Sequence, residues 1–266
     1  MEISFANSGD ELKLKRLFLN CFDDTLGFVN MFFDHYFSVD NTLVAEDNGE
    51  KIGLLFMLPC AAEEKPCFYI YGVCVSPDFR GNGVGTALIK AAEKEAKKRG
   101  GKIILHPEDE ELFPFYEKAG LSPAAYLREV NVVPEGEAVT LFPITPAEYK
   151  TLRDSAFSKD NPVLWDNFAT EYALLQETFF GGTSYRFECE EASGIVLCGR
   201  AGGEPFIKET TAPPSLLPRV CAAVCKKLGG ESVRVWLPDS AETGTRKTVG
   251  YGNGFSNDLY LNLMLD

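Results

Sequence analysis

The chain has 266 residues, of which 45% are hydrophobic and 12% aromatic, and its net charge is −13. This composition can bury one large core or two ordinary ones and argues against a disordered chain. The negative charge argues against a nucleic-acid partner, since phosphate contacts need clustered Lys and Arg. It favours a cationic small molecule or peptide, although many soluble proteins are simply acidic.

Two regions bear on targeting and membrane insertion. The first seven residues lack a basic region followed by an apolar block. The longest apolar stretch, 53–62, is short and contains Pro59. We therefore expect a cytoplasmic protein with no membrane partner.

The eight cysteines are scattered singly through apolar segments, so we expect them to be reduced. Only Cys221 and Cys225 are closely spaced, on one predicted helical face among Val and Ala residues. No histidine is near enough to complete a ligand set with them, so core packing is favoured over metal binding. We expect no metal.

In the first half of the chain, apolar periodicity and turn signals predict an alternation of strands and helices. Strands are expected at 3–5, 42–45, 52–58, 68–75, 102–105 and 126–133, with an Asn48-Gly49 hairpin turn. Helices are expected at 12–22, at 26–37, and from 84 to the Gly100-Gly101 pair.

The second half repeats this order. Strands are expected at 139–142, 185–189, 195–198, 205–208 and 233–236, and helices at 145–157, 162–180 and 216–228. The first of these helices begins with a capping box at Thr145, and we place the start of the second at Asn161. The short segments 118–121 and 247–251 follow the Gly pairs of the two halves at similar distances.

A matched order over roughly 90 residues indicates two similar α/β domains. We expect the boundary in the polar connection 134–137, which gives domains 1–134 and 135–266.

The main candidate for chemistry is a glycine-rich turn between a strand and a helix. Its sequence is Arg80-Gly81-Asn82-Gly83-Val84-Gly85-Thr86. Glycines allow close approach of a phosphate, and the first N–H groups of a helix have no acceptors within the helix. The arginine adds a fixed positive charge. The turn is therefore predicted to bind a pyrophosphate.

Spacing separates three nucleotide-binding motifs. A P-loop needs a Lys before Thr86, which is absent. A Gly-x-Gly-x-x-Gly fingerprint fails as well, because its third glycine would fall at Thr86 or Leu88. The segment does resemble the Arg/Gln-x-x-Gly-x-Gly/Ala signature of the GNAT superfamily of N-acetyltransferases. The preceding strand, Val73-Cys74-Val75-Ser76-Pro77, and a downstream Phe115-Tyr116 followed by Lys118-Ala119-Gly120-Leu121 also resemble that family.

The resemblance implies two GNAT-like α/β domains, each a mixed, centrally splayed sheet flanked by helices. It also implies acetyl-CoA as co-substrate, with its pyrophosphate at the glycine turn and its pantetheine along Val73, Cys74 and Val75. Tyr116 would be the general acid for the departing thiolate. The general base is open: His106, just past a strand, is one candidate, whereas His35 is expected on a helix surface or in the core.

The second half departs from the signature. Its turn at 210–215 has no glycine or arginine, and Pro213 and Pro214 remove amide donors. Counting back from the shared glycine places Arg246 at the position of Tyr116. We therefore expect this domain to keep the fold without the chemistry.

The expected function is transfer of an acyl group, acetyl in particular, from coenzyme A to an amine of a small molecule or peptide. The alternatives are a coenzyme-A-binding regulatory or scaffold protein without catalysis, and a nucleotide-dependent enzyme. The acceptor amine and the oligomeric state cannot be read from the sequence.

Overall fold

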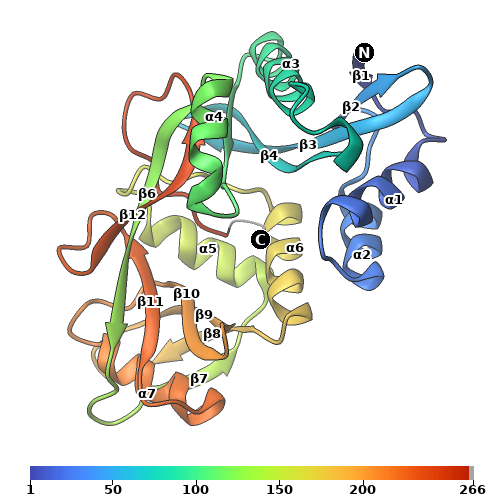
Figure 1. Cartoon of the computed structure of the whole chain (residues 1–266). Coiled ribbons are helices and arrows are strands. Elements are labelled where there is room, and N and C mark those ends of the chain that lie inside the picture. The colour runs from blue at the N-terminus through green and yellow to red at the C-terminus, as the bar shows by residue number, and fades with distance from the viewer. Residues whose placement is uncertain (264–266) are drawn as a thin grey trace. The chain divides into compact units, whose positions relative to one another are not determined.

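The computed structural model describes residues 1–263 and consists of two compact α/β units (Figure 1). Unit 1 comprises Met1–Ala124 and Gly250–Ser256, and unit 2 comprises Ala125–Val249 and the residues from Asn257 onward. Within the part of the chain that is described, none of the helices has the length and apolar composition that a bilayer span requires.

Unit 1 has the predicted alternation of strands and helices. In chain order its elements are β1 (Glu2–Phe5), α1 (Glu11–Cys21), α2 (Leu26–Tyr36), β2 (Thr42–Asp47), β3 (Glu50–Ala62), β4 (Lys65–Val75), the 3₁₀ turn η1 (Pro77–Phe79), α3 (Val84–Lys98), β5 (Lys102–Leu105), the 3₁₀ turn η2 (Glu110–Leu112), α4 (Phe113–Ala119) and the start of β6 (Ser122–Val132). The strand order is β1-β2-β3-β4-β5, antiparallel except for the parallel β4–β5 pair.

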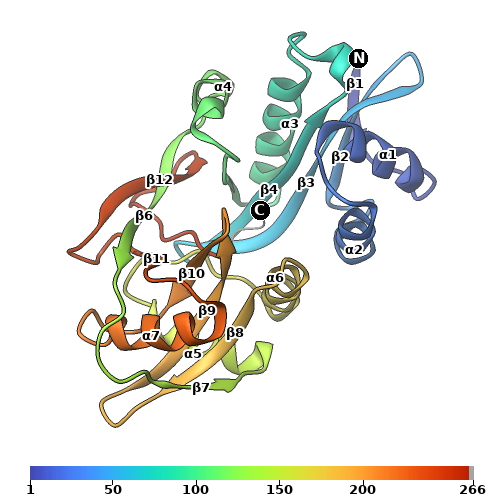
Figure 2. The same ribbon diagram turned by 60° about the horizontal axis from the view of Figure 1, so that its bottom comes forward.

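Helices cover both faces of this sheet (Figure 2). On one face, Leu55 and Met57 of β3 belong to a buried cluster with Leu88 and Ile89 of α3. On the other, Phe56 packs against aromatic rings of α1 and α2. This alternation follows from the two-residue period of a strand, which directs successive side chains to opposite faces.

A β-bulge bends β4 near its carboxyl end. The β3–β4 register runs from Leu54↔Cys74 to Phe56↔Tyr71, so two residues of β3 span three of β4. The extra residue falls at Gly72, whose φ is +59°. A Cβ there would lie 2.6 Å from the Phe18 ring, so both the backbone and the packing require glycine.

The sheet of unit 1 is splayed at β4 and β5. These strands pair only from Cys67↔Lys102 to Tyr69↔Ile104, whereas β4 continues to Val75. In unit 2, β10 and β11 pair at only two positions. The expected fold, with a splayed mixed sheet in each unit, is therefore confirmed.

Unit 2 repeats the arrangement. Its elements are β7 (Thr140–Pro143), α5 (Pro146–Ala156), α6 (Asn167–Phe179), β8 (Thr183–Glu188), β9 (Ser193–Ala201), β10 (Glu204–Thr210), α7 (Leu217–Leu228) and β11 (Val233–Pro238), with most of β6 and of β12 (Thr245–Gly252). The strand order β7-β8-β9-β10-β11 matches that of unit 1, and β6 pairs with the outer edge of β11.

One helix of unit 2 begins later than predicted. We expected a helix at 162–180 that starts at Asn161. Instead, α6 begins at Asn167, and its N-cap is Asp166, whose side chain accepts a hydrogen bond from the Ala169 amide. Asn161 instead has a left-handed φ of +50°, and Pro162 after it forms a parallel bridge with Tyr260. Both Asn161 and Asp166 are good capping residues, and this tertiary contact decides between them.

The last strands of the two halves also differ from expectation. β6 pairs with β11 of unit 2, and the end of β12 pairs with β5 of unit 1 through Tyr251↔Leu105 and Gly252↔Ile104. The contacts thus divide the chain after Ala124, whereas we predicted a connection at 134–137. The equivalence of Arg246 with Tyr116 is wrong: Arg246 lies in strand β12, whereas Tyr116 lies in helix α4.

Candidate functional site

The glycine turn joins β4 to α3, as predicted. Gly81 and Gly83 have φ values of +77° and +80°, in the left-handed region that favours glycine. Gly83 is the residue immediately before helix α3. Residues 80–83 are exposed.

The backbone amides of this turn have no protein acceptor. Among the described residues, no backbone or side-chain acceptor receives a hydrogen bond from the N–H groups of residues 81–86. The first amide of the helix region to be bonded is that of Ala87, which donates to the Gly83 carbonyl at 3.0 Å. These unpaired donors coincide with the positive end of the helix dipole, an arrangement suited to an anion.

The glycines of the turn serve two different purposes. A Cβ added at Gly81 or Gly83 would meet nothing within 4 Å, so there is open space beside both. At Gly85 a Cβ would lie 3.0 Å from the Phe115 ring. The packing of α3 against α4 thus accounts for Gly85, while Gly81 and Gly83 leave room for a ligand's phosphates. The turn therefore fits the pyrophosphate of coenzyme A.

The opened edge of β4 adjoins this turn. The Ser76 amide donates a hydrogen bond to the carbonyl of Ile52 in β3, at 2.8 Å. Cys74 is paired with Leu54 of the same strand. The main-chain N–H and C=O groups of successive residues alternate between the two edges of a strand. Those of Ser76 and Cys74 face β3, so those of Val75 and Val73 face the opposite edge, which β5 leaves open. Cys74 presents its main chain to β3.

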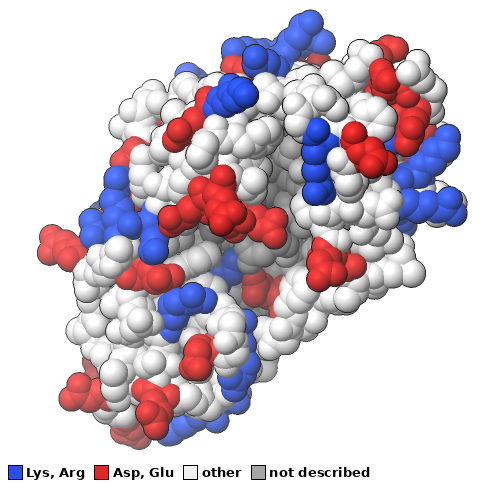
Figure 3. All heavy atoms as spheres, in the orientation of Figure 1, with Lys and Arg blue, Asp and Glu red and all other residues white. Residues whose placement is uncertain are grey.

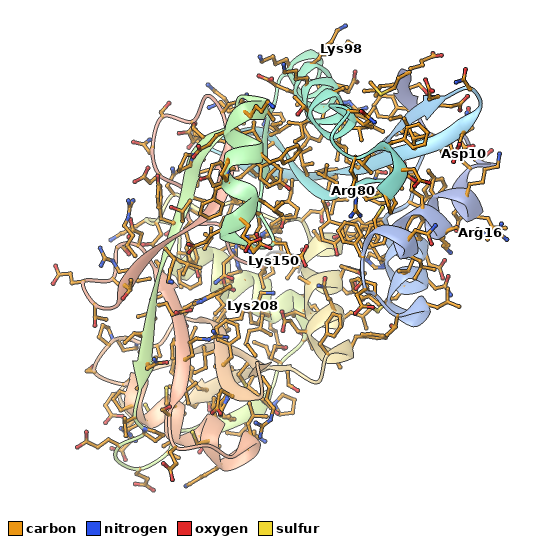
Figure 4. All side chains as sticks on the ribbon, in the orientation of Figure 1. Asp10, Arg16, Arg80, Lys98, Lys150 and Lys208 are labelled. Carbon is orange, nitrogen blue, oxygen red and sulfur yellow. The ribbon has the colours of Figure 1, made fainter. Side chains whose placement is uncertain are left out.

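The carbonyl of Val75 accepts two side-chain hydrogen bonds. The Nε of Arg80 donates to it at 3.2 Å and the Sγ of Cys21 at 3.4 Å. Figure 4 shows Arg80 beside the start of α3, and Cys21 is the last residue of α1. A hydrogen bond with the Cys74 thiol, supported by Arg80 and opposed by burial, lowers the pKa of Cys21 to about 7.

Tyr116 lies on α4 and is 7% exposed. Its ring contacts those of Phe115 and Tyr251, with centroid separations of 5.0 and 6.4 Å. Burial, Glu108 and Asp109 raise the pKa of Tyr116 to about 12, which keeps the hydroxyl protonated at physiological pH. Its role as general acid stays a prediction.

The other candidates are placed as the sequence indicated. β4 carries no carboxylate between Phe68 and Val75. His106 follows the end of β5 and is half-buried, and His35 lies in α2 next to Tyr36. Residues 1–263 contain no group of three metal-binding side chains.

The corresponding turn of unit 2 is differently built. The amides of Leu216 and Leu217 both donate to the carbonyl of Pro213, at 2.9 and 3.2 Å. Pro213, Pro214 and Pro218 have no amide hydrogen to donate. Few donors remain for a phosphate here, in contrast to the turn of unit 1.

A buried polar network also lies against β10 of unit 2. A register shift between Ile207 and Glu209 turns the Glu209 side chain towards α5. There Glu209 forms an ion pair with Arg153 at 3.1 Å, and both side chains are 0% exposed. Tyr149 and Tyr260 donate their hydroxyls to the same carboxylate, at 2.7 and 3.2 Å.

The C-terminal segment completes this network. The side-chain amide of Asn262 donates to the carbonyl of Lys208 at 2.8 Å, and the indole of Trp165 donates to the Asn262 carbonyl at 2.9 Å. The strand that corresponds to β4 is therefore covered by the chain itself.

Comparison with known proteins identifies the first unit. The profile of the acetyltransferase (GNAT) family matches residues 13–121, which include the glycine turn and Tyr116. The chain contains a GNAT acetyltransferase domain. An uncharacterized N-acetyltransferase of Methanocaldococcus jannaschii is 36% identical over 88 residues; the match covers 30% of this chain and 38% of that protein. The chain thus spans well under half the length of this curated relative.

Solved structures extend the similarity of fold over both units. A probable N-acyltransferase of unknown function from Enterococcus faecalis V583 has a TM-score of 0.71 at 14% identity, covering 94% of this chain and 72% of that one. A putative acetyltransferase from Pyrococcus horikoshii has a TM-score of 0.62 at 14% identity, covering 100% and 94%. A tandem GNAT protein from the clavulanic acid biosynthesis pathway has a TM-score of 0.54 at 16% identity, covering 96% and 99%. The tandem GNAT fold of this chain is therefore confirmed.

Two features of the site were not found from the sequence. The bulge at Gly72 and the position of Cys21, which shares the Val75 carbonyl with Arg80, depend on contacts between distant segments. Only Gly72 carried a local signal, since a glycine inside a strand often marks a bulge.

Proposed function

We propose that unit 1 transfers an acetyl group from acetyl-CoA to an amine of a small molecule or peptide. The observation that carries this proposal is the row of unpaired amides at 81–86, which lies at the start of α3 in a domain of the GNAT family. The exposed Arg80 guanidinium adds positive charge next to these donors.

In the proposed reaction the amine nitrogen attacks the thioester carbonyl directly. A C–N bond forms, and an outward-facing main-chain N–H of β4, such as that of Val73, stabilises the tetrahedral oxyanion. The C–S bond then breaks, the sulfur keeps the bonding electrons, and Tyr116 donates its proton to the departing thiolate. The proton lost by the nitrogen restores the tyrosine through solvent or a nearby base.

We further propose that unit 2 does not bind coenzyme A and instead stabilises the chain or shapes the acceptor site. Its turn has its amides bonded to Pro213, and β10 is covered by the Arg153–Glu209 network. Both features leave little room for a pantetheine arm. The expected stoichiometry is one coenzyme per chain.

Titration and a thiol-release assay together test this proposal. Isothermal titration with acetyl-CoA, ATP and NAD should give binding of acetyl-CoA alone, at one site per chain. The thiol-release assay with a panel of amines should then give amine-dependent release of coenzyme A. Binding without release for any amine would favour a coenzyme-binding protein without catalysis, and binding of ATP or NAD instead would refute the assignment.

A further inference from the structure

Two cysteines of unit 1 come together at the carboxyl end of β4. Cys21, the last residue of α1, is half-buried, and Cys74 of β4 is buried. Val73 and Val75 pack against the core cluster beneath α3, so the alternation of a strand directs the Cys74 side chain to the opposite face, where α1 packs. There the thiols of Cys21 and Cys74 form a hydrogen bond.

The thiol pair lies beside a positive charge. The Sγ of Cys21 donates a hydrogen bond to the carbonyl of Val75, and the Nε of Arg80 donates to the same oxygen. A basic group reaches the surface beside the start of α3 (Figure 3), where Figure 4 labels Arg80. The carbonyl of Val75 faces the edge of β4 that β5 leaves open, so the pair adjoins the expected path of the pantetheine arm.

Cys21 and Cys74 differ in reactivity. The Cys74 thiol and Arg80 lower the pKa of Cys21 to about 7, so a large fraction of this thiol is ionised at neutral pH. Burial raises the pKa of Cys74, which stays a thiol. Oxidants react with the thiolate, and redox-sensitive cysteines are commonly accessible thiolates with a second thiol beside them. Cys21 has the first property, and Cys74 provides the second thiol.

We propose that Cys21 and Cys74 form a reversible disulfide in response to a hydroperoxide, and that this disulfide weakens the binding of acetyl-CoA to unit 1. The formation of the disulfide depends on the two thiols alone, whereas its effect rests on the proposed function. Oxidation thereby turns off a site that is competent when both thiols are reduced.

The chemistry proceeds in two steps. The Cys21 thiolate attacks a peroxide oxygen, an S–O bond forms, the O–O bond breaks, and the leaving oxygen takes up the proton that Cys21 released on ionisation. The sulfur of Cys74 then attacks the sulfur of the Cys21 sulfenic acid. An S–S bond forms, the S–O bond breaks, and the departing oxygen takes the Cys74 proton and leaves as water. With hydrogen peroxide, two thiols and one peroxide give one disulfide and two waters.

The disulfide changes the open edge of β4 in two ways. Oxidised Cys21 has no S–H group, so the carbonyl of Val75 loses the hydrogen bond from that side chain. The covalent bond also draws the end of α1 towards β4. The helix already packs closely against this strand, since a Cβ at Gly72 would lie 2.6 Å from the ring of Phe18, one turn before Cys21. The new bond therefore displaces residues 73–75, along which the pantetheine arm is expected to pair.

Peptide mapping locates the disulfide. The full chain is treated with hydrogen peroxide, the remaining thiols are alkylated, and the chain is digested with trypsin. A bond between Cys21 and Cys74 joins the tryptic peptides 17–51 and 52–80. We expect this cross-link to form and dithiothreitol to remove it.

Isothermal titration measures the effect on the coenzyme. The oxidised chain is freed of peroxide and titrated with acetyl-CoA, whose thioester cannot reduce a disulfide as the thiol of free coenzyme A would. We expect a dissociation constant at least several-fold higher than that of the reduced chain, since a hydrogen bond at the open edge is lost and the strand is displaced. Dithiothreitol should restore the original value.

Two serine variants assign the effect to the pair. Cys21→Ser should lose the cross-link and should bind acetyl-CoA equally well before and after peroxide treatment. Comparison with its own reduced form removes any effect of the substitution itself. Cys74→Ser should also lose the cross-link, and its Cys21 should remain a sulfenic acid that dimedone labels, because the second thiol is gone.

Cys189→Ser is the matched control. Cys189 is half-buried like Cys21 and donates to a main-chain carbonyl at the same distance, 3.4 Å, but it belongs to unit 2. This variant should keep both the cross-link and the loss of affinity on oxidation.

The outcomes separate the two proposals. The inference is wrong, and the acetyltransferase assignment stands, if no cross-link forms or if the cross-link survives in Cys74→Ser. The same holds if peroxide instead joins Cys60 to Cys67, which lie opposite each other in β3 and β4. A Cys21–Cys74 bond that leaves the acetyl-CoA affinity unchanged or increased refutes the inference as well. If the reduced chain does not bind acetyl-CoA, the proposed function fails, and the inferred effect on binding fails with it. The cross-link together with a loss of affinity in the parent chain and the control, but not in Cys21→Ser, supports the inference.

Discussion

Replacement of Gly83 by aspartate tests whether the glycine turn binds coenzyme A. Gly83 is at the amino-terminal end of α3 with φ +80°, and Gly100, just past the other end, has φ +72°. Neither position would bring a Cβ within 4 Å of another group. Gly83→Asp and Gly100→Asp therefore place the same side chain in the same backbone conformation, with a ligand expected at only one of them.

The magnitudes follow from this matched pair. A left-handed non-glycine residue costs about 1–2 kcal/mol at either position. The helix dipole and the unpaired amides offset part of this cost for a carboxylate at Gly83, the N-cap of α3, and the dipole adds to it at Gly100. At Gly83 the carboxylate would also lie beside the bound pyrophosphate. Two unit charges ~5 Å apart at an effective dielectric constant of ~20 repel by about 3 kcal/mol, which is roughly a hundredfold loss of affinity.

Isothermal titration with acetyl-CoA and urea unfolding measure the two quantities separately. The expected result is a decrease in unfolding free energy that is no larger for Gly83→Asp than for Gly100→Asp, with a large loss of acetyl-CoA affinity only for Gly83→Asp. If Gly83→Asp binds acetyl-CoA as tightly as the parent chain, the turn does not hold the pyrophosphate.

The remaining predictions concern the acid, the buried pair and the reactive thiol. Tyr116→Phe should lower kcat on the order of a hundredfold without changing acetyl-CoA affinity, and an equal rate would remove the hydroxyl from the mechanism. Arg153→Met leaves the Glu209 charge buried and should lower the unfolding free energy by about 3–5 kcal/mol in urea titrations, whereas combining it with Glu209→Leu should recover much of that loss; no recovery would argue against the pair. Because the thiolate is the reactive form, alkylation of Cys21 by iodoacetamide should accelerate as pH rises and be half-maximal near pH 7. Arg80→Ala should move this midpoint to higher pH, and a parent midpoint at the ordinary thiol value would contradict the lowered pKa.

Local signals were sufficient for most of the fold. The Asn48-Gly49 turn has both residues at positive φ, the capping box at Thr145 is present, and β5 spans the predicted 102–105. Each of these depends on neighbouring residues or on a regular apolar period.

The predictions that were wrong concern features that depend on contacts between residues far apart in the sequence. The start of α6 depends on the bridge between Pro162 and Tyr260, and the partners of β6 and β12 depend on which half of the chain supplies a sheet's last strand. Pairing β12 with β5 requires residues about 150 apart to meet. Two similar halves offer equivalent edges, so the sequence pattern alone could not assign the strands.

Only the part of the candidate site that is contiguous in the sequence could be predicted. The turn at 80–86 is contiguous, and its glycine spacing is visible in the sequence. Cys21 and Arg80 belong to separate segments, and the fold brings both to the carbonyl of Val75. A single cysteine in a helical pattern carries no local signal of such a contact, so its position did not stand out.

Amide hydrogen exchange at residues 81–86 tests the central claim most directly. These N–H groups have no protein acceptor among the described residues, so they should exchange rapidly in the chain alone and slowly with saturating acetyl-CoA. The amides of Leu216 and Leu217, which are bonded to Pro213, serve as an internal reference and should not change. Exchange at 81–86 that is equally fast with and without acetyl-CoA would contradict the account.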